Sequence, residues 1–363
     1  MHSAYLASLH LLPGMRHAHL ATLMKYVSGD AEQLWKTLPQ AIRTLGVQEL
    51  DKEQVYAVHR KLQVLRVYRY LQEHKIVLLY GALLPTAIRE ARMPPFVVYC
   101  RGDVDLLQGD LLSIVGARRM TAYGQMVIES LVPHVVASGY ATVSGLAYGV
   151  DAHVHEQTVL SGGKTVAVLG TGVDRCYPAV HHRLVERIID HGGLLLSDYP
   201  LYTKPRPWHF TQRNRLIAAV SSATVVVEAG EKSGSLYTAE EALELGRSVY
   251  AIPGSVFSPM SIGCNWLLSL PEERRVNVLQ KPSDLVELGM SKETDWKDEP
   301  MSGTMHPLLR FVHEQARSTT NIADAAQIPM GECLTALTKL EVQGLVRRVS
   351  GGWIKNILRR TGR

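Results

Sequence analysis

The sequence predicts an α/β fold: an extended Rossmann-like parallel sheet domain, flanked by a small N-terminal helical domain and a C-terminal winged-helix domain. A strand, a glycine turn and a helix occur three times in succession between residues 111 and 178, helical patterns precede this stretch, and helices with a hairpin follow it. We expect the helical domain at residues 1–75, the Rossmann-like domain at 76–290, a linker at 291–304 and the winged-helix domain at 305–363.

The repeated units supply the parallel sheet. An apolar run at residues 111–115 leads through Gly-Ala-Arg to a helix that begins after Thr121, a favourable N-cap. The strand at 141–143 ends in a Ser-Gly turn, with Asp151 placed to cap the next helix, and the strand at 165–169 ends in Gly-Thr-Gly. Right-handed crossovers between parallel strands place these turns along the carboxyl edge of the sheet, where we expect the ligand.

These turns offer backbone N–H groups to an anion. Glycine and serine at a strand-to-helix turn let the main chain approach a ligand closely, and the helix N-terminus favours negative charge, phosphate above all. The alternative is that each glycine only makes a tight turn. Several such turns on one edge favour a ligand site.

Residues 1–75 have a helical pattern. The segment Leu-Leu-Pro-Gly-Met at 11–15 resembles the turn of a helix-hairpin-helix, a module that presents backbone amides to DNA phosphates. A later helix is expected to have one apolar and one basic face, marked by Val55, Val58, Leu62 and Leu65 and by Arg60, Lys61, Arg66 and Arg69. The alternative is a small helical cap with a solvated basic face.

Short strands are expected at 76–79, 96–99 and 194–196, and a proline-rich loop follows the last of them at 201–210. This loop interleaves basic and aromatic residues, which suits single-stranded nucleic acid because cations follow the phosphates while rings stack on unpaired bases. A surface loop held by its prolines explains the same pattern, so the loop alone leaves both interpretations open.

A helix is expected to begin at Thr211, with Arg213 and Arg215 in its first turn. Cations there oppose the helix dipole, which mildly indicates a nearby phosphate. A buried strand at 224–228 then leads through a turn rich in glycine and serine into a helix at 236–246.

The C-terminal part has the pattern of a winged helix. We expect a helix at 307–317, a short helix capped by Thr319 or Thr320, a helix at 330–343 and a hairpin around Ser-Gly-Gly at 350–352. The third helix would bury Leu334, Leu337 and Leu340. Its exposed face is weakly charged, so docking to a protein and contact with DNA stay equally open.

Composition is that of an ordinary globular protein, with 46% hydrophobic and 20% charged residues. No apolar run reaches the roughly 18 residues that a membrane span needs, and the N-terminus makes a poor signal peptide, so we expect a cytoplasmic protein. The net charge of +5 is located in the tail: residues 301–363 carry nine Lys and Arg against four Asp and Glu, whereas the first 300 residues carry 30 of each. DNA affinity in the body must therefore come from local clusters.

Common catalytic and cofactor motifs are not matched. The Gly-Lys-Thr at 163–165 ends a helix and opens a strand, the reverse of a phosphate-binding P-loop, and Arg175 replaces the third small residue of a dinucleotide fingerprint. The four cysteines have no CxxC spacing, and His153 and His155 have no evident third metal ligand. We expect no cofactor, no metal and no catalytic residues.

The motifs at the strand ends, taken in order, closely resemble the DprA/Smf family over about residues 96–288. They are 144–151 with His155, 170–174 with Tyr177 and Pro178, 196–200, 213–215 with Ile217 and Ala218, Val227 and Glu228 with 233–236, and 252–254 with Gly263 and Asn265.

This resemblance implies a DNA-processing protein without enzymatic activity. Members of the family bind single-stranded DNA on an extended Rossmann fold, dimerise, protect incoming DNA and load a RecA-type recombinase onto it during natural transformation. Carried over by position, the residues that would line the DNA pocket are Gly116, Arg118, Ser144, Gly145, Lys204, Arg206, Phe210, Arg213 and Asn214. Ala117 stands where many members have serine, and Thr211-Gln212 stand where a proline is usual.

Two other functions remain as alternatives. Residues 233–240 resemble a Rossmann group that cleaves nucleoside monophosphates with a catalytic glutamate, although the Pro-Gly-Gly-x-Gly-Thr run of that group is missing. A winged-helix regulator of duplex DNA is the third possibility. It would bind duplex DNA without residues 96–288.

Overall fold

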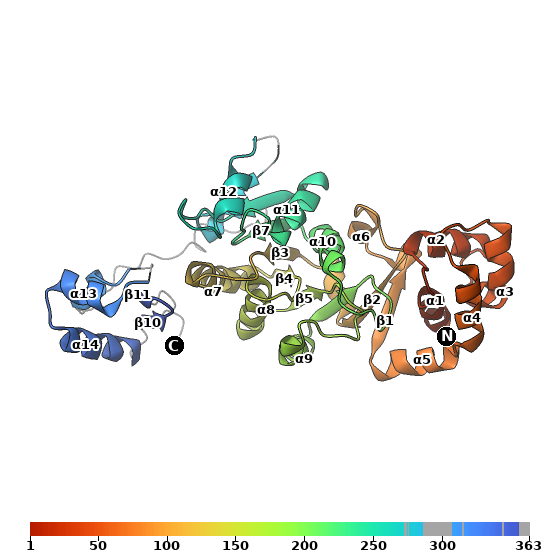
Figure 1. Ribbon diagram of the computed structural model, residues 1–363, viewed down its shortest axis with the longest axis horizontal. Helices are drawn as coiled ribbons and strands as arrows, with labels where there is room; N and C mark the ends of the chain where they lie inside the picture. The colour runs from red at the N-terminus through yellow and green to blue at the C-terminus, as the bar shows by residue number, and fades with distance from the viewer. Residues whose placement is uncertain (272–273, 275, 286–306, 314–315, 343–344, 356–363) are drawn as a thin grey trace.

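The computed structural model describes residues 1–271, 274, 276–285, 307–313, 316–342 and 345–355. Helices from the start of the chain lie at one end, the sheet with its flanking helices lies in the middle, and the C-terminal helices and hairpin lie at the other end (Figure 1). The linker expected at 291–304 falls outside the described residues. No helix in the described part of the chain is long and apolar enough to cross a membrane.

Residues 1–75 are helical, as the sequence predicts. Asp30 and Asp51 begin two of these helices by accepting hydrogen bonds from backbone N–H groups of the first turn. The single basic helix expected around residues 55–69 is wrong, because the chain leaves helical geometry at Leu62 and Gln63. The helices are α1 (His2–His10), α2 (His17–Tyr26), α3 (Ala31–Thr44), α4 (Lys52–Lys61) and α5 (Val64–Glu73).

The described strands of the middle part form a nine-stranded, mostly parallel sheet in the order β1-β2-β6-β5-β4-β3-β7-β8-β9. The pairs β1–β2 and β2–β6 are antiparallel, and the other pairs are parallel. The predicted α/β class with a Rossmann-like sheet is confirmed. The strands are β1 (Ile76–Tyr80), β2 (Val97–Gly102), β3 (Leu111–Val115), β4 (Ala141–Ser144), β5 (Thr165–Val168), β6 (Leu194–Ser197), β7 (Ala223–Val226), β8 (Ser248–Ala251) and β9 (Val276–Val278).

Helices cover both faces of this sheet, because its central strands are apolar on both sides. Leu111 and Val115 of β3 pack in the core formed with α10 (Pro207–Val220), α11 (Gly234–Glu244) and α12 (Ile262–Leu268). Leu112 and Ile114 pack on the opposite face against α7 (Ala122–Ala137) and α8 (Val150–Leu160), and α9 (His182–Asp190) continues that layer. Each large apolar side chain buried in this way contributes about 1.5–3 kcal/mol.

Shorter helical turns connect these elements. They are α6 (Thr86–Arg89) and the 3-10 helices η1 (Gly81–Leu83), η2 (Val104–Gln108), η3 (Ala179–His181) and η5 (Pro282–Asp284).

The direction of winding reverses at β3. The chain proceeds from β3 to β6 on one side and then returns to add β7, β8 and β9 on the other side. The carboxyl ends of β3 and β7 therefore flank a topological switch point, where a crevice is expected in doubly wound sheets.

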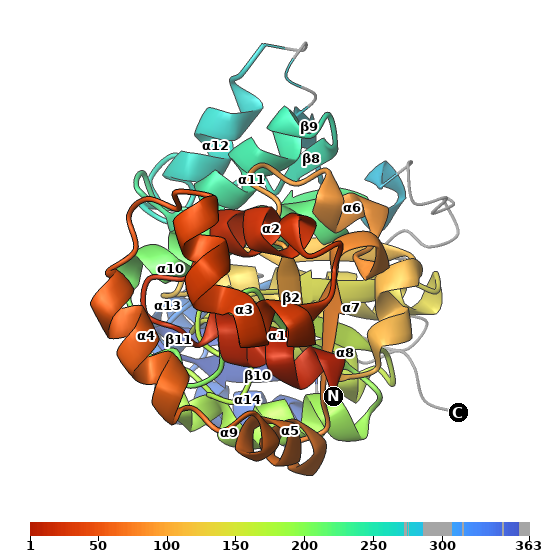
Figure 2. The ribbon, with the colours of Figure 1, turned by 90° about the vertical axis from the view of Figure 1, so that its right-hand side faces the viewer.

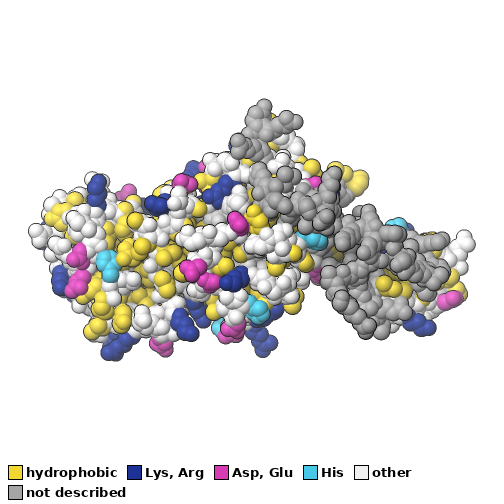
Figure 3. All heavy atoms as spheres, turned by 180° about the vertical axis from the view of Figure 1, so that it is seen from behind, with side chains coloured by type: hydrophobic (Ala, Val, Ile, Leu, Met, Phe, Trp, Pro, Cys, Tyr) yellow, Lys and Arg dark blue, Asp and Glu magenta, His cyan; other side chains and the backbone are white. Residues whose placement is uncertain are grey.

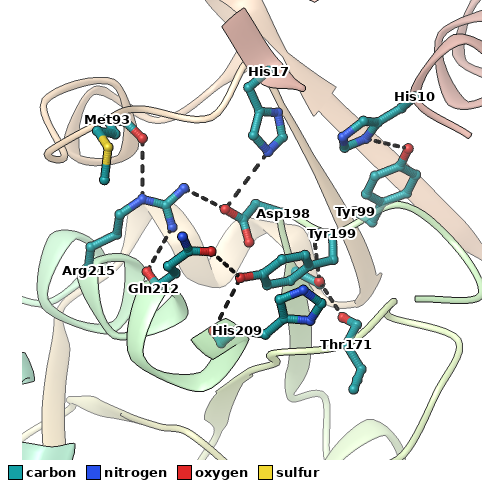
Figure 4. Close-up of polar contacts among 11 residues, drawn as sticks. His10, His17, Met93, Tyr99, Thr171, Asp198, Tyr199, His209, Gln212 and Arg215 are labelled. Carbon is teal, nitrogen blue, oxygen red and sulfur yellow. Dashed lines mark hydrogen bonds and ion pairs between the residues drawn. The ribbon is translucent and has the colours of Figure 1, made fainter. Parts of the chain in front are cut away.

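The N-terminal helices share a hydrophobic core with the sheet, and Figure 2 shows them stacked over its β1–β2 end. A polar network also joins the two parts (Figure 4). Arg215 of α10 pairs with Asp198 at 2.5 Å, and His17 of α2 lies 3.8 Å from the same carboxylate oxygen. Burial alone would raise the pKa of Asp198, but the charges of Arg215 and His17 lower it.

The C-terminal part contains η8 (Pro307–Arg310), α13 (Thr319–Ala326), α14 (Met330–Val342) and the hairpin β10 (Val346–Val349) and β11 (Gly352–Lys355). The predicted helix at 307–317 is wrong: of the residues described there, 307–310 form a 3-10 turn, and the backbone of Arg317 is extended and pairs with Trp353 of the hairpin. Ser318, rather than a threonine, caps α13. Leu337 and Leu340 are buried as expected, but Leu334 is 43% exposed.

A charged contact joins this C-terminal part to the sheet part. Arg347 of β10 donates to both carboxylate oxygens of Glu129 on α7, each at 3.1 Å, and His153 of α8 approaches the same carboxylate at 3.4 Å. Burial alone would raise the pKa of Glu129, but hydrogen bonds from His153, Gln125 and Arg347 lower it to about 2. The pair is therefore ionised near neutral pH.

We expect Arg347→Ala to release the C-terminal part, because the substitution removes the cation bound by Glu129. Small-angle X-ray scattering should show a larger radius of gyration for this variant than for the wild type. Arg348→Ala is the matched control, since Arg348 lies over the Trp353 ring at 5.8 Å, within the C-terminal part itself. Equal radii for Arg347→Ala and the wild type would contradict the prediction.

Candidate nucleic-acid interface

A cavity of about 500 Å³ opens at the switch point between β3 and β7. We call it the switch-point cavity. Its walls are the turn after β3, the start of α8, the first two turns of α10 and the turn that leads into α11. They include Gly116, Arg118, Ala147, Asp151, Phe210, Arg213, Asn214, Lys232, Ser233, Ser235 and Thr238. The predicted carboxyl edge of the sheet thus carries a cavity.

The turn after β3 requires glycine at its first position. A Cβ on Gly116 would lie 2.7 Å from the Val150 side chain and 2.9 Å from the carbonyl oxygen of Glu228. The turn therefore packs closely between α8 and the end of β7, and it directs Arg118 outward. Arg118 is exposed and its guanidinium lies 5.6 Å from the centre of the Phe210 ring. Such a pairing holds the cation over the cavity without an acidic partner among the described residues.

Glu228 stabilises this turn through hydrogen bonds to Thr121. Its carboxylate accepts a hydrogen bond from the Thr121 backbone N–H at 2.8 Å and another from the Thr121 hydroxyl. Thr121 in turn caps α7, as the sequence predicts, by accepting a bond from the Gly124 N–H. In the sequence, Glu228 belongs to one of the motifs that resemble the family, but its hydrogen bonds to Thr121 follow only from the pairing of β3 with β7.

Arg213 is buried at the back of the cavity, with 3% of its surface exposed. Its guanidinium donates to the carbonyl oxygens of Gly145, at 2.7 Å, and Val168, and so joins the ends of β4 and β5 to α10. Burial lowers the pKa of Arg213 to about 10, an effect that the nearby Asp151 opposes. The sequence predicts Arg213 as a DNA contact, and in the structure it lies in the cavity wall while its Nε atom and one terminal nitrogen donate to the protein.

Ser144 and Gly145 lie behind Arg213 and not in the cavity wall. Ser144 is fully buried and its hydroxyl donates to the carbonyl oxygen of Ile114 at 2.8 Å. A side chain at position 145 would clash with the Arg213 guanidinium, so glycine is needed for the arginine to reach the backbone. These two residues shape the wall rather than face the opening.

Asp151 does not cap α8, in contrast to the prediction. Gly149 is the N-cap, with a φ of 74°, and Asp151 lies inside the first turn. Its carboxylate accepts a long hydrogen bond of 3.4 Å from the Ala147 N–H. Burial raises the pKa of Asp151, although Arg213 lowers it in part.

Helix α10 begins at Pro207, four residues before the predicted start. Proline is favourable there because the first helical N–H groups have no partner within the helix. Arg213 therefore lies in the second turn and Arg215 in the third, and the argument that they oppose the helix dipole in the first turn is wrong. Phe210 instead occupies the first turn, half-buried in the cavity wall.

Asn214 joins α10 to α11. Its side-chain amide donates to the Gly234 carbonyl oxygen at 2.9 Å, and its oxygen accepts a bond from Arg213 at 3.2 Å. The N-terminal ends of α10 and α11 consequently face the same cavity, where their dipoles favour an anion.

The turn before α11 adds donors that the sequence reading missed. Lys232 is exposed at the cavity, the hydroxyls of Ser233 and Ser235 lie 2.8 Å apart, and the buried hydroxyl of Thr238 has no hydrogen-bond partner among the described residues. The Gly-Glu-Lys-Ser-Gly-Ser composition of this turn was a usable signal, because the turn follows the strand beside the switch point.

Lys204 and Arg206 do not line the cavity. Both are exposed on the segment before Pro207, and the Arg206 guanidinium lies 5.3 Å from the centre of the Trp208 ring. Since Pro207 lies in the cavity wall, these groups form a basic and aromatic approach beside it. On the face seen in Figure 3, basic and acidic side chains are intermixed.

Neither histidine of α8 forms part of a metal site. His155 is buried, with its Nδ1 atom 2.7 Å from the Thr165 hydroxyl, and burial lowers its pKa to about 3. His153 contacts Glu129 and Glu156. No group of three or more His, Cys, Asp and Glu side chains suited to a metal occurs in the described ranges.

Comparison with known proteins identifies the family. The model of the family "DNA recombination-mediator protein A" matches residues 75–288. The DNA processing protein DprA of Bacillus subtilis is 36% identical over 240 residues, which cover 63% of this chain and 80% of that protein. Protein Smf of Escherichia coli is 32% identical over 273 residues, which cover 72% of each chain.

Solved structures agree with this relationship. The structure of DNA processing protein A from Streptococcus pneumoniae matches with a TM-score of 0.66 and 28% identity, covering 78% of this chain and 97% of that one. DNA processing protein A from Helicobacter pylori, whose structure describes a single-stranded DNA binding mode, matches with a TM-score of 0.53 and 28% identity, covering 59% of this chain and 94% of that one. With a Rossmann-like sheet and a cavity at its switch point, this chain belongs to the DprA/Smf family of DNA-processing recombination mediators.

Proposed function

We propose that this protein binds single-stranded DNA in the switch-point cavity. One observation carries the proposal: Arg118 is exposed over the Phe210 ring, at a cavity that two helix N-termini and a glycine turn face. A phosphate would be bound by the amides and the cation, while an unpaired base would stack on the ring. The single-stranded DNA binding mode of the Helicobacter pylori relative supports this choice of ligand.

The proposed residues act in two ways. Gly116, Arg118, Phe210 and Asn214 lie in the cavity wall and would contact the strand, and Lys204 and Arg206 would bind phosphates on the approach. Arg213 would act indirectly, because it holds the ends of β4 and β5 against α10. Gly145 leaves the space that its guanidinium needs, and Ser144 joins β4 to β3.

The wider role that we propose is that of a recombination mediator without enzymatic activity, acting in the cytoplasm. The protein would protect incoming single strands and load a RecA-type recombinase onto them during transformation. Family membership supports this role. Contacts to phosphate and to ring faces are independent of sequence, as such a role requires.

The nucleoside-monophosphate hydrolase is the weaker alternative. Glu240, the counterpart of its catalytic glutamate, does not line the switch-point cavity and lies instead beside Tyr237 and Trp266 on another part of the surface. Incubation with nucleoside monophosphates should therefore yield no free base. Turnover would overturn the non-enzymatic role.

A homodimer is part of the proposal. Tyr237, Ile262 and Trp266 are each 43–52% exposed around a hollow of about 530 Å³ on α11 and α12, and exposed apolar groups of this size commonly mark an interface. Light scattering after size-exclusion chromatography should give twice the chain mass for the wild type and the monomer mass for Trp266→Arg. Leu160→Arg, at an apolar position of α8 that is 67% exposed, is the control.

Arg118→Ala should weaken single-stranded DNA binding about tenfold to a hundredfold for all sequences alike, since the lost contact is a charge-assisted bond to the backbone. Fluorescence anisotropy over a range of salt concentrations should show the salt slope flatten by about 0.7. Arg183→Ala is the control. It removes an exposed arginine on α9, so it has the same net charge as Arg118→Ala, and it should bind DNA as the wild type does. An unchanged slope in folded Arg118→Ala would count against the proposed site.

Arg213→Ala should act on stability first. The substitution leaves the carbonyl oxygens of Gly145 and Val168 without their charged donor, a change that costs about 1–3 kcal/mol for each buried group and lowers the midpoint of thermal unfolding. Calorimetry would measure it, with the exposed neighbour Thr211→Ala as the control. A variant that unfolds at the wild-type temperature but loses DNA binding would instead make Arg213 a direct contact.

A further inference from the structure

A second cavity, of about 780 Å³, lies between the N-terminal helices, the segment after β1 and the end of β6. We call it the helix-side cavity, and its walls include Met15, His17, Ala18, Met93, Phe96, Asp198, Gln212 and Arg215. We propose that it takes one nucleobase of the same single strand that the switch-point cavity binds. This inference rests on the proposed function and extends it to a second site.

The polar groups of this cavity suit the edge of a base. Asp198 is 4% exposed, and although its Oδ2 atom binds Arg215, its Oδ1 atom is buried with no hydrogen-bond partner among the described residues. Gln212 accepts a bond from the Tyr199 hydroxyl at 3.3 Å, which leaves its amide N–H groups available. A buried carboxylate oxygen without a donor is costly, so a ligand with an N–H group is favoured there. Every nucleobase offers such a donor beside acceptors for the glutamine.

The apolar groups suit the faces of a base. Met15 is buried, Phe96 is half-buried and Met93, with 67% of its surface exposed, stands at the opening beside Pro94 and Pro95. Flat rings and sulfur atoms of this kind pack against aromatic ligands. The cavity is also large enough for one base, since small-molecule sites commonly measure about 300–1,000 Å³.

The charges around the opening favour a nucleotide over a cationic ligand. Arg16 and Arg89 are exposed at the cavity, and Arg215 lies inside it, against the single carboxylate of Asp198. Arg16 also pairs with Glu49 at 2.9 Å, but Glu49 is not part of the cavity wall. The opening therefore attracts the phosphate that accompanies a base.

Helix α10 connects the two cavities. Phe210, Thr211 and Asn214 line the switch-point cavity, whereas Gln212 and Arg215 line the helix-side cavity. A strand bound over Arg118 that continues across the exposed first turns of α10 thus reaches the second opening. Stacking of one base per protein ring is the usual way in which such surfaces bind a single strand.

A length series of labelled oligonucleotides tests the inference by fluorescence anisotropy. As the oligonucleotide is lengthened, we expect wild-type affinity to rise in one step of about fivefold or more when a base reaches the helix-side cavity. An abasic unit in place of the nucleotide that produces the step, tested at both ends, should abolish the rise. Ala18→Phe, which fills the cavity from α2, should abolish it for the intact oligonucleotide, and Gln212→Ala should reduce it.

Thr22→Phe is the matched control, because Thr22 is exposed one turn further along α2 and does not line the cavity. It should keep the step, and all variants should unfold at the wild-type temperature. Retention of the step in both Ala18→Phe and Gln212→Ala, or an abasic unit that leaves it intact, would overturn the inference. If Arg118→Ala still weakens the binding of short oligonucleotides in that case, only the proposal of a second site is contradicted. If the wild type binds no single-stranded DNA, both the second site and the proposed function are contradicted.

Discussion

The buried Arg213 guanidinium is the contact on which the candidate site depends. It binds carbonyl oxygens at the ends of β4 and β5 while its own backbone belongs to α10, so three elements meet at one charged group. The Arg213 guanidinium also explains two of its neighbours. Gly145 leaves the space that the guanidinium needs, and the carboxylate of Asp151 supplies a nearby negative charge. A cation held in this way fixes where the first turns of α10, and with them Phe210, stand in the cavity wall.

Much of the fold follows from the sequence alone. Strands such as 111–115 and 141–143 are short apolar runs between glycine turns, and their parallel pairing follows from the helices between them. The elements that were predicted wrongly are those whose local sequence pattern is compatible with two different structures. Prolines at 205 and 207 resemble a loop, yet the second one opens α10, and residues 307–317 look helical although Arg317 pairs with Trp353.

The candidate site was predicted at the level of the sheet edge but not at the level of each side chain. The sequence marks both Arg118 and Arg213 as DNA contacts, and only the fold shows that the first is exposed while the second is buried. Lys232 and Thr238 were missed because β7 lies beside β3 in space, although more than a hundred residues separate them in the chain. Side-chain burial depends on such long-range pairing, which a local pattern does not contain.

The spacing of the two arginines on α10 has a consequence for the length of this segment. Arg213 and Arg215 are two residues apart, so they project about 200° from each other around the helix. One holds the strand ends of the sheet, and the other holds Asp198 beside the N-terminal helices. Inserting or deleting one residue between Arg213 and Arg215 would turn one guanidinium by about 100° relative to the other and break at least one of the two anchors. The number of residues between these two arginines is therefore constrained by two partners at once.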